Sequence, residues 1–296
     1  MTQTLNRVVV LGAGGQLGSE LVASAPTGVE CLPYTRAQLD LTDSEAVTSV
    51  LRGQGASVVI NAAAYTAVDQ AESEPEQAAA GNTYGPGVLA AACANAHCRL
   101  IHVSTDFVFD GTASEPYTPA SATSPLGVYG QTKLDGEVAV LSSLPDALIV
   151  RTGWVYSAYG NNFVKTMLRL MNERDALSVV ADQVGTPTWA AGLAKTLWAF
   201  ADRPDLTGIY HWSDAGVCSW YDFAVAIQEE GESRGLLNRC VPVTPIAASA
   251  YPTPARRPAY SVLDKSATWS DLAIRGVHWR VQLRAMLEQL QESKHV

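Results

Sequence analysis

RVVVLGAGGQLG, residues 7–18, joins an apolar run to a turn with glycines at positions 12, 15 and 18. An apolar run of this length is typical of a buried strand, and the glycines would let the backbone turn tightly and approach a pyrophosphate. A helix that begins just after the turn would offer its unpaired N–H groups to the same anion. The stretch therefore predicts the first unit of a dinucleotide-binding fold, with an ordinary glycine-rich turn as the alternative. Its glycine spacing differs by one residue from G-x-G-x-x-G, which points away from the ordinary dehydrogenase subgroup.

Short apolar runs alternate with helical patterns after this turn. Strands are expected at residues 7–12, 29–34, 57–64, 98–104 and 147–153, and helices at residues 15–25, 43–53, 76–96 and 125–143. Strands that alternate with helices at this rhythm indicate βαβ units and a parallel sheet that is covered on both faces. The expected fold class is therefore α/β, with a Rossmann-type doubly wound parallel sheet.

The rhythm loosens after Val150, where the content of Trp, Pro and Tyr rises. Residues 213–227 and 244–264 look like loops and short helices. We expect residues 1–155 to form the dinucleotide-binding domain and residues 156–296 to form a smaller α/β C-terminal domain for substrate. The loop GTPT at 185–188 is expected to lead the chain back, so that about residues 186–208 complete the first domain and the second is discontinuous.

The composition excludes several classes of partner. The 296 residues carry a net charge of -9 and contain no dense Lys/Arg block, whereas nucleic acid or an anionic membrane needs clustered positive charge. No stretch approaches the roughly 20 apolar residues of a membrane span, and the opening MTQTLNRVVVLG has no signal-peptide layout. The five cysteines are scattered and form no metal-spaced cluster. We therefore expect a cytoplasmic protein with reduced cysteines, no metal and a small-molecule partner, as a monomer or homodimer.

The end of the second predicted strand bears on the choice of cofactor. Sites that prefer NAD place an acid there for the ribose 2′-hydroxyl, whereas NADP sites accommodate an arginine. This sequence has Arg36 and no acid before Asp40, so NADPH is favoured, with NADH as the alternative. Asp40 begins the stretch DLTD, residues 40–43, in which Thr42 or Asp43 could equally be a plain helix cap.

The third and fourth predicted strands end in small and hydroxyl-bearing residues. Ala63 and Ala64 would let a flat cofactor ring approach the backbone, although tight helix packing against the sheet would use the same residues. Ser104, Thr105 and Asp106 stand where the fourth strand would meet a cleft. A hydroxyl there could bond a substrate oxygen, and an ordinary turn is the alternative.

YGQTK places Tyr129 and Lys133 four residues apart on a predicted helix. Residues at i and i+4 share one helical face, roughly 5–6 Å apart at Cβ. A nearby ammonium favours the phenolate, so Lys133 is expected to lower the pKa of Tyr129 and let the phenol exchange a proton with a carbonyl or alcohol. The alternative is a half-buried tyrosine beside a solvated lysine.

Together and in this order, the glycine turn, the alanine-rich strand end, the Ser/Thr position and Y-x-x-x-K resemble the extended short-chain dehydrogenase/reductase family. Over essentially its whole length, the chain resembles the dTDP-4-dehydrorhamnose reductases of that family. These enzymes reduce the C4 keto group of dTDP-4-dehydro-L-rhamnose to dTDP-L-rhamnose. The motifs that carry the resemblance are GGQLG, LDLTD, NAAAYTAVDQAESEP, STDFVFDG, YGQTKLDGE, RTGWVYS, NNFVKTM, DQVGTPTWA and ARRPAYSVLD.

The resemblance implies a role for each matched position. Tyr129 would donate a proton to the C4 oxygen, Lys133 would set its pKa and bind the nicotinamide ribose, and Thr105 would bond the same oxygen. With the residues argued above, the expected cofactor contacts are Gly12, Gly15, Gln16, Leu17, Gly18, Arg36, Asp40, Leu41, Ala63, Ala64, Tyr65, Thr66, Tyr129 and Lys133. The expected substrate contacts are Val68, Thr105, Asp106, Trp154, Arg256 and Arg257, the two arginines because guanidinium forks match diphosphate oxygens.

Differences between this sequence and the motifs of related families bear on the expected reaction and on the expected absence of a metal. Sugar-nucleotide dehydratases follow the Thr-Asp pair with a glutamate, whereas this chain has Phe107, so dehydration is disfavoured. Some of these reductases dimerise through magnesium, and Glu20 resembles one ligand, but WAAGLAK at 189–195 contains no acid, so no metal is expected. The alternatives are a non-catalytic subunit similar to the regulatory subunit of methionine adenosyltransferase, a nucleotide-sugar 4-epimerase, and a GDP-fucose synthase.

Overall fold

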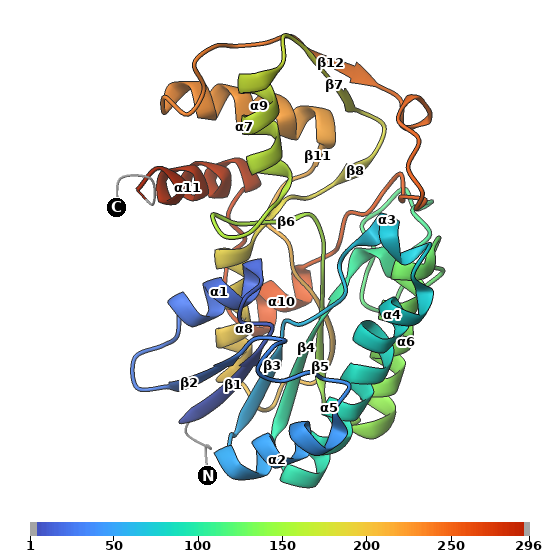
Figure 1. Ribbon diagram of the computed structural model, residues 1–296, viewed down its shortest axis with the longest axis vertical. Helices are drawn as coiled ribbons and strands as arrows, with labels where there is room; N and C mark the ends of the chain where they lie inside the picture. Colours follow the sequence, from blue (N-terminus) through green and yellow to red (C-terminus); the bar gives the residue numbers. More distant parts are fainter. Residues whose placement is uncertain (1–4, 293–296) are drawn as a thin grey trace.

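A parallel six-stranded sheet organises the first part of the chain in the computed structural model, which describes residues 5–292 (Figure 1). The chain begins in the middle of the sheet and winds outward in both directions, in the order β10-β5-β4-β3-β1-β2, so the expected doubly wound α/β fold is confirmed. In folds of this kind ligands bind in the crevice at the carboxyl ends of the strands, where the winding changes direction, and here this point lies between β1 and β3. The strands are β1 (Arg7–Leu11), β2 (Glu30–Tyr34), β3 (Val58–Asn61), β4 (Arg99–Thr105), β5 (Leu148–Thr152) and β10 (Gly208–His211).

Helices cover both faces of this sheet (Figure 1). One face carries α1 (Gln16–Ala23) and α8 (Ala190–Ala201), and the other carries α2 (Ser44–Gln54), α5 (Gly85–Ala96) and α6 (Val128–Ser143). Along β1, Val8 and Val10 join the core beneath α1 and α8, while Val9 and Leu11 join the core on the opposite face. Burial on both faces explains why the strands are almost continuously apolar.

A π-helical turn interrupts the helix that was expected at residues 76–96. The segment consists of α4 (Pro75–Ala79), the π turn η1 (Ala80–Tyr84) and α5, and it follows the short helix α3 (Val68–Ala71). Such turns are frequent at functional sites because the extra residue redirects the neighbouring side chains and backbone. The 3-10 turn η2 (Asp106–Val108) redirects the chain in a similar way after β4.

The second region lies over the carboxyl edge of the sheet (Figure 1). Three helices pack around an apolar cluster that includes Phe223 and Met286, and three two-stranded sheets complete the region. The elements are β6 (Val155–Tyr156), α7 (Phe163–Glu173), β7 (Leu177–Val180), β8 (Val184–Gly185), β9 (Thr188–Trp189), β11 (Cys218–Ser219), α9 (Trp220–Ser233), β12 (Val243–Ile246), η3 (Ala248–Ala250) and α11 (Trp279–Glu292). The expectation of only loops and short helices at 213–227 is wrong, because a capping box of Ser219 and Asp222 begins the 14-residue helix α9.

The chain returns from this region to the first sheet more than once. After β9 it forms α8 and then β10, which pairs with β5. Later α10 (Ser266–Asp271) packs near β10, where Tyr210 donates to Asp271 at 2.8 Å. The boundaries given above for the two domains stay predictions. No helix between residues 5 and 292 is long and apolar enough to cross a membrane.

Candidate active site

The glycine turn brings β1 and the end of β3 into close contact. Gly12 adopts φ +76°, and a Cβ on it would lie 2.7 Å from the backbone nitrogen of Ala63. A Cβ on Gly18, in the first turns of α1, would overlap the carbonyl oxygen of Gly12. Only glycine fits at these two positions, so the sequence pattern reflects a packing requirement as well as room for a ligand.

The amino end of α1 is open to an anion. Gly15 is its N-cap, and no side chain among the described residues caps its first N–H groups. Gly14 and Gly15 are exposed, whereas Leu17 is buried in the core. Free N–H groups and the positive end of the helix dipole suit a pyrophosphate, so the residues present fit a dinucleotide. The side chain of Gln16 accepts a hydrogen bond from Asn162 Nδ2 at 3.0 Å, which ties this turn to the second region.

The turn after β2 holds the residues expected to recognise the adenosine end of the cofactor. Arg36 is highly exposed and lies 3.6 Å from Asp40, measured between Nε and Oδ2. Asp40 accepts bonds from the backbone and side chain of Thr42, and these bonds lower the pKa of its carboxyl. Asp43 is the N-cap of α2, so the alternative interpretation of this stretch as a helix cap is confirmed for Asp43. Leu41 is buried, which leaves only its backbone for a cofactor.

The segment from Ala63 to Thr66 leads from the carboxyl end of β3 to α3. Ala64 and Thr66 are exposed, and the Tyr65 hydroxyl donates to Glu74 at 2.9 Å. Asn82, in the π turn, accepts from the Tyr65 nitrogen at 2.9 Å and donates to the Tyr65 oxygen at 3.0 Å. This side chain therefore fixes the segment from both sides, and it was missed because it lies inside an apparently ordinary helix.

Two residues expected to carry the chemistry, Tyr129 and Thr105, meet where β4 ends, next to the expected substrate contact Asp106. Tyr129, half-buried on α6, forms a hydrogen bond with Thr105, whose hydroxyl also donates to Asp106 Oδ1 at 3.1 Å. Burial raises the pKa of Asp106 to about 6, against hydrogen bonds that include those of Ser261 and Thr105. Phe107 packs edge-on against Tyr129, with ring centroids 5.5 Å apart, at the position where a dehydratase would carry its glutamate.

Lys133 does not act on Tyr129 as expected. Burial raises the pKa of Tyr129 to about 12, aided by the charge of Asp106 and opposed by the bond with Thr105. The expectation of a lowered pKa is therefore wrong for this structure. Lys133 is almost completely buried, and its Nζ donates to the Val103 oxygen at 2.7 Å. Burial also lowers the pKa of Lys133 to about 8, against the opposing charge of Glu137.

A buried ion pair lies one helical turn beyond Lys133. Glu137 accepts from Arg151 Nε at 2.9 Å and from Nη2 at 2.6 Å, and both side chains are 3% exposed. Tyr129, Lys133 and Glu137 thus follow one face of α6 at intervals of four residues. Glu137 was missed, although the i+4 spacing from Lys133 was visible in YGQTKLDGE.

Trp154 lies just beyond β5 with a strained backbone. Its φ is +51°, which is unusual for a bulky residue and occurs mostly where function or packing demands it. Its ring stacks on Trp220, with centroids 3.5 Å apart and planes 7° from parallel. The two rings form an aromatic surface between β5 and α9, so Trp154 is both a packing residue and a candidate for sugar contact.

The two arginines expected at the diphosphate differ in their surroundings. Arg257 forms a two-pronged ion pair with Asp69, with Nη1 and Nη2 at 3.0 and 2.8 Å from the carboxylate oxygens. The pair links α3, where Val68 is half-buried, to the loop before residue 258. Arg256 is exposed and has no ion pair within residues 5–292. Of these two arginines in the described chain, Arg256 is therefore the one with an unpaired charge.

Glu20 faces the protein interior, where Ser157 donates to it at 2.6 Å. Burial raises the pKa of its carboxyl against the bonds from Ser157 and Gln289. Across the described part of the chain, no group of three or more His, Cys, Asp or Glu side chains could hold a metal ion.

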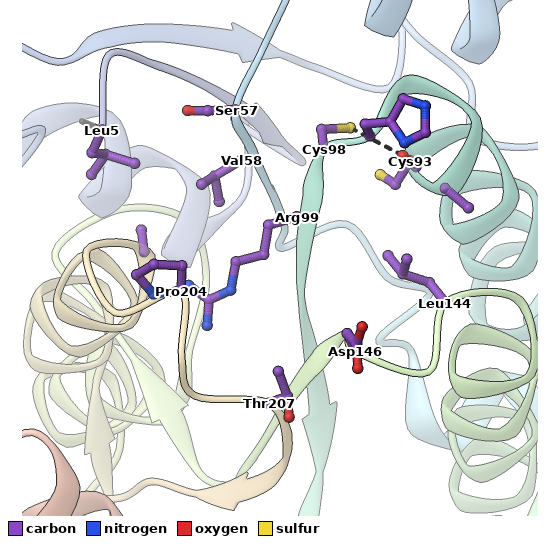
Figure 2. Close-up of a pocket in the computed structure, with 13 residues that line it drawn as sticks. Leu5, Ser57, Val58, Cys93, Cys98, Arg99, Leu144, Asp146, Pro204 and Thr207 are labelled. Atoms are coloured by element: carbon purple, nitrogen blue, oxygen red, sulfur yellow. Dashed lines mark hydrogen bonds between the residues drawn. The ribbon is translucent and has the colours of Figure 1, made fainter. Parts of the chain in front are cut away.

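A cavity of about 400 Å³ lies at the opposite edge of the sheet (Figure 2). It is lined near the amino ends of the strands by Ser57, Arg99, Asp146 and Thr207, among others. Its described lining contains none of the expected site residues. The candidate active site is therefore the crevice at the carboxyl ends, where the residues of the preceding paragraphs meet.

Residues 6–292 match the family model described as the RmlD substrate binding domain. The chain belongs to this family. The dTDP-4-dehydrorhamnose reductase of Aggregatibacter actinomycetemcomitans is 41% identical over 285 residues, which cover 94% of this chain and 97% of the relative.

Solved structures of this kind share the fold of the RmlD family member described here. The dTDP-4-dehydrorhamnose reductase of Clostridium acetobutylicum superposes with a TM-score of 0.90 at 40% identity, over 96% of this chain and 99% of that one. The Bacillus anthracis enzyme, solved in complex with NADP, gives a TM-score of 0.91 at 35% identity with the same coverage. The expected family is therefore confirmed.

Proposed function

We propose that this protein reduces the C4 keto group of dTDP-4-dehydro-L-rhamnose with NADPH to give dTDP-L-rhamnose, the last step of dTDP-rhamnose biosynthesis. The observation that carries the proposal is the contact between Tyr129 and Thr105 at the carboxyl end of β4, where Lys133 donates to the Val103 oxygen two residues earlier. Relatives that bear the name of this oxidoreductase match almost the whole chain. This favours catalysis over the regulatory-subunit, epimerase and fucose-synthase alternatives.

Tyr129 is the proton donor in this proposal. Its pKa of about 12 keeps the phenol protonated at neutral pH, as a donor must be before the reaction. The bound nicotinamide supplies the hydride. Thr105 holds the same carbonyl oxygen that receives the proton, while Lys133 binds the nicotinamide ribose. A positioned general acid contributes about 10² to 10⁴ in rate.

The cofactor contacts are proposed along the crevice. The open amino end of α1 would hold the pyrophosphate, and Ala63 and Ala64 leave room for a flat ring. Arg36 would meet the 2′-phosphate, because its guanidinium is exposed and its partner Asp40 is only loosely paired. This supports NADPH over NADH.

The substrate contacts are proposed on the opposite side of the crevice. Asp106, Val68 and Trp154 would contact the sugar, and Arg256 would meet the diphosphate. Arg257 would join it by releasing Asp69, which makes Arg256 the stronger candidate.

We further propose a cytoplasmic location and a monomer or homodimer without a bridging metal. The five cysteines are all free thiols, which supports a reducing compartment. The inward orientation of Glu20 supports the absence of a metal-bridged dimer.

The test is to mix the purified protein with dTDP-4-dehydro-L-rhamnose and NADPH or NADH, and to follow cofactor oxidation together with product formation. Turnover with NADPH is expected, and absence of turnover with either cofactor would refute the proposal. Tyr129→Phe should lose about 10² to 10⁴ in kcat while it binds NADPH normally. Tyr84→Phe is the matched control, since Tyr84 is 56% exposed and has none of the expected site roles. A fully active Tyr129→Phe would mean that the proton comes from another group.

A further inference from the structure

A chain of buried polar contacts ends at Lys133, and its other two members have no part in the function proposed above. It consists of Asn61 on β3, His102 on β4 and Lys133 on α6, all of which are nearly or completely buried. The Asn61 Nδ2 atom lies 3.0 Å from His102 Nδ1, and His102 Nε2 lies 3.5 Å from Lys133 Nζ. Three polar side chains placed in line inside a hydrophobic sheet need a reason, because burial of such groups is costly.

The first link fixes which nitrogen of the imidazole carries the proton. The Ala63 nitrogen donates to Asn61 Oδ1 at 3.1 Å, so the amide group of Asn61 is turned with its Nδ2 towards His102. That NH₂ group donates, and His102 Nδ1 must accept. A neutral imidazole with an accepting Nδ1 carries its hydrogen on Nε2. Burial, and then the charge of Lys133, lower the pKa of His102 well below its ordinary value, so the ring stays neutral.

The second link brings this Nε2–H group towards the lysine nitrogen. An ammonium has three donors and no acceptor, so Nε2–H opposes it, and the distance of 3.5 Å between the two nitrogens is long for a hydrogen bond. A neutral amine has a lone pair that can accept from Nε2–H. The same geometry therefore disfavours the charged form of Lys133 and favours its neutral form.

We propose that His102 is a positioning residue for Lys133, held by Asn61 as the Nε2–H tautomer so that the lysine can release a proton and regain one. The role of this proton in turnover rests on the function proposed above. The arrangement of Asn61 and His102 does not depend on that function. Because Asn61 also binds the Ala63 nitrogen, the chain connects the lysine to the backbone that would approach the cofactor.

The charges around Lys133 oppose each other. On α6, Glu137 favours the ammonium, and Arg151 on β5 holds Glu137 in place. Tyr129 lies on the same helical face and stays neutral at its pKa of about 12. Burial acts in the other direction and lowers the pKa of Lys133 to about 8. In our proposal the Nε2–H group of His102 acts in the same direction as burial. The ammonium group of Lys133 can thus lose its proton near neutral pH, whereas an exposed lysine would remain charged.

The tautomer can be measured in the wild-type protein. Nitrogen-15 NMR of histidine-labelled protein distinguishes the two ring nitrogens, and comparison with His102→Gln assigns the signal of His102 among the five histidines. We expect a protonated Nε2, an unprotonated Nδ1 and no titration in the neutral range. A proton on Nδ1, or titration of His102 near neutral pH, would overturn the proposal without reference to activity.

The effect on the lysine is measured by carbon-13 NMR of labelled lysine, with Lys133→Met to assign the signal. His102→Phe removes the N–H donor, so Lys133 should titrate about one pH unit or more higher than in the wild type. Asn61→Asp is a nearly isosteric second variant if His102→Phe does not fold. Its carboxylate accepts from Nδ1–H and reverses the tautomer, so the titration should again move upward. His97→Asn is the control, because His97 is exposed and its φ of +53° suits asparagine.

Activity then separates the two proposals. If the protein reduces the substrate, the alkaline limb of its pH profile should move upward in His102→Phe together with the Lys133 titration. If it does not reduce the substrate, the proposed function fails while the NMR result still decides the role of His102. An unchanged Lys133 titration in folded His102→Phe or Asn61→Asp would show that His102 only fills space.

Discussion

The buried ion pair between Glu137 and Arg151 leads to a prediction about stability. Glu137→Gln keeps the shape of the side chain but removes its charge, which leaves Arg151 buried without a counter-charge. Both side chains are 3% exposed and share two hydrogen bonds of 2.9 and 2.6 Å. Removal of one partner from such a pair costs about 3–5 kcal/mol, because the desolvation of the other partner is no longer compensated.

The chain contains a matched control for this prediction. Arg169 and Glu173 on α7 are 2.7 Å apart, nearly the same distance as the buried pair, but their side chains are 58% and 53% exposed. Water screens such a pair, so Glu173→Gln should cost less than about 1 kcal/mol. The two substitutions are chemically identical, and any difference between them measures the effect of burial.

The assay is urea unfolding at neutral pH, followed by tryptophan fluorescence and circular dichroism, with the midpoint and slope compared among variants. A loss of less than about 1 kcal/mol in Glu137→Gln, or a loss equal to that of Glu173→Gln, would refute the reasoning. A double variant, Glu137→Leu with Arg151→Met, should recover most of the lost stability, since a buried ion pair can often be replaced by apolar residues. A double variant as unstable as Glu137→Gln would show that the pair fits no apolar replacement.

Two further predictions concern cofactor choice and pH. Arg36→Ala should weaken NADPH binding about tenfold and leave NADH binding nearly unchanged in isothermal titrations, and an equal loss for both would exclude a contact with the 2′-phosphate. Burial raises the pKa of Asp214 from 3.8 to about 8, so the folded protein holds a proton there that the unfolded chain has lost, and stability falls as pH rises through this window. Asp214→Asn should therefore become more stable relative to the wild type as pH rises from about 4 to 8, by up to about 1.4 kcal/mol per pH unit; a difference in unfolding free energy that is the same at both ends would contradict this.

The sheet could be predicted from the sequence because each of its strands is marked by residues that are neighbours in the chain. Each strand of the first region is an apolar run bounded by a turn, and the observed β1 and β4 begin and end within one or two residues of the expected ranges. The glycines at 12 and 18 were equally visible, since one tight turn requires both. The family motifs fixed the order in which these pieces meet. Local pattern failed at η1, because a single π turn inside a helix is rare and its sequence resembles that of a continuous α-helix.

The electrostatic surroundings of the site could not be predicted in the same way. Spacing alone put Tyr129 and Lys133 on one helical face, but the state of each depends on groups that are distant in the chain. His102 is 31 residues from Lys133, and Asp69 is 188 residues from Arg257. A polar side chain inside an apolar strand is the feature that would have drawn attention to His102, and the same is true of Asn61 at the end of VVIN. The sequence around Asn61 or His102 does not show which side chain that residue contacts.

The contrast between Tyr129 and Lys133 follows from one physical fact. Burial favours the neutral form of either group, so it raises the pKa of the phenol to about 12 and lowers that of the amine to about 8. A proton donor that keeps its proton until substrate arrives is well served by the first shift, and a residue that must replenish a proton near neutral pH is served by the second. Glu137 favours the charged form of Lys133 through its own charge. In our proposal the fixed N–H donor of His102 favours the neutral form. The helix thus supplies the spacing of YGQTK, and the strands beneath it determine what the two side chains can do.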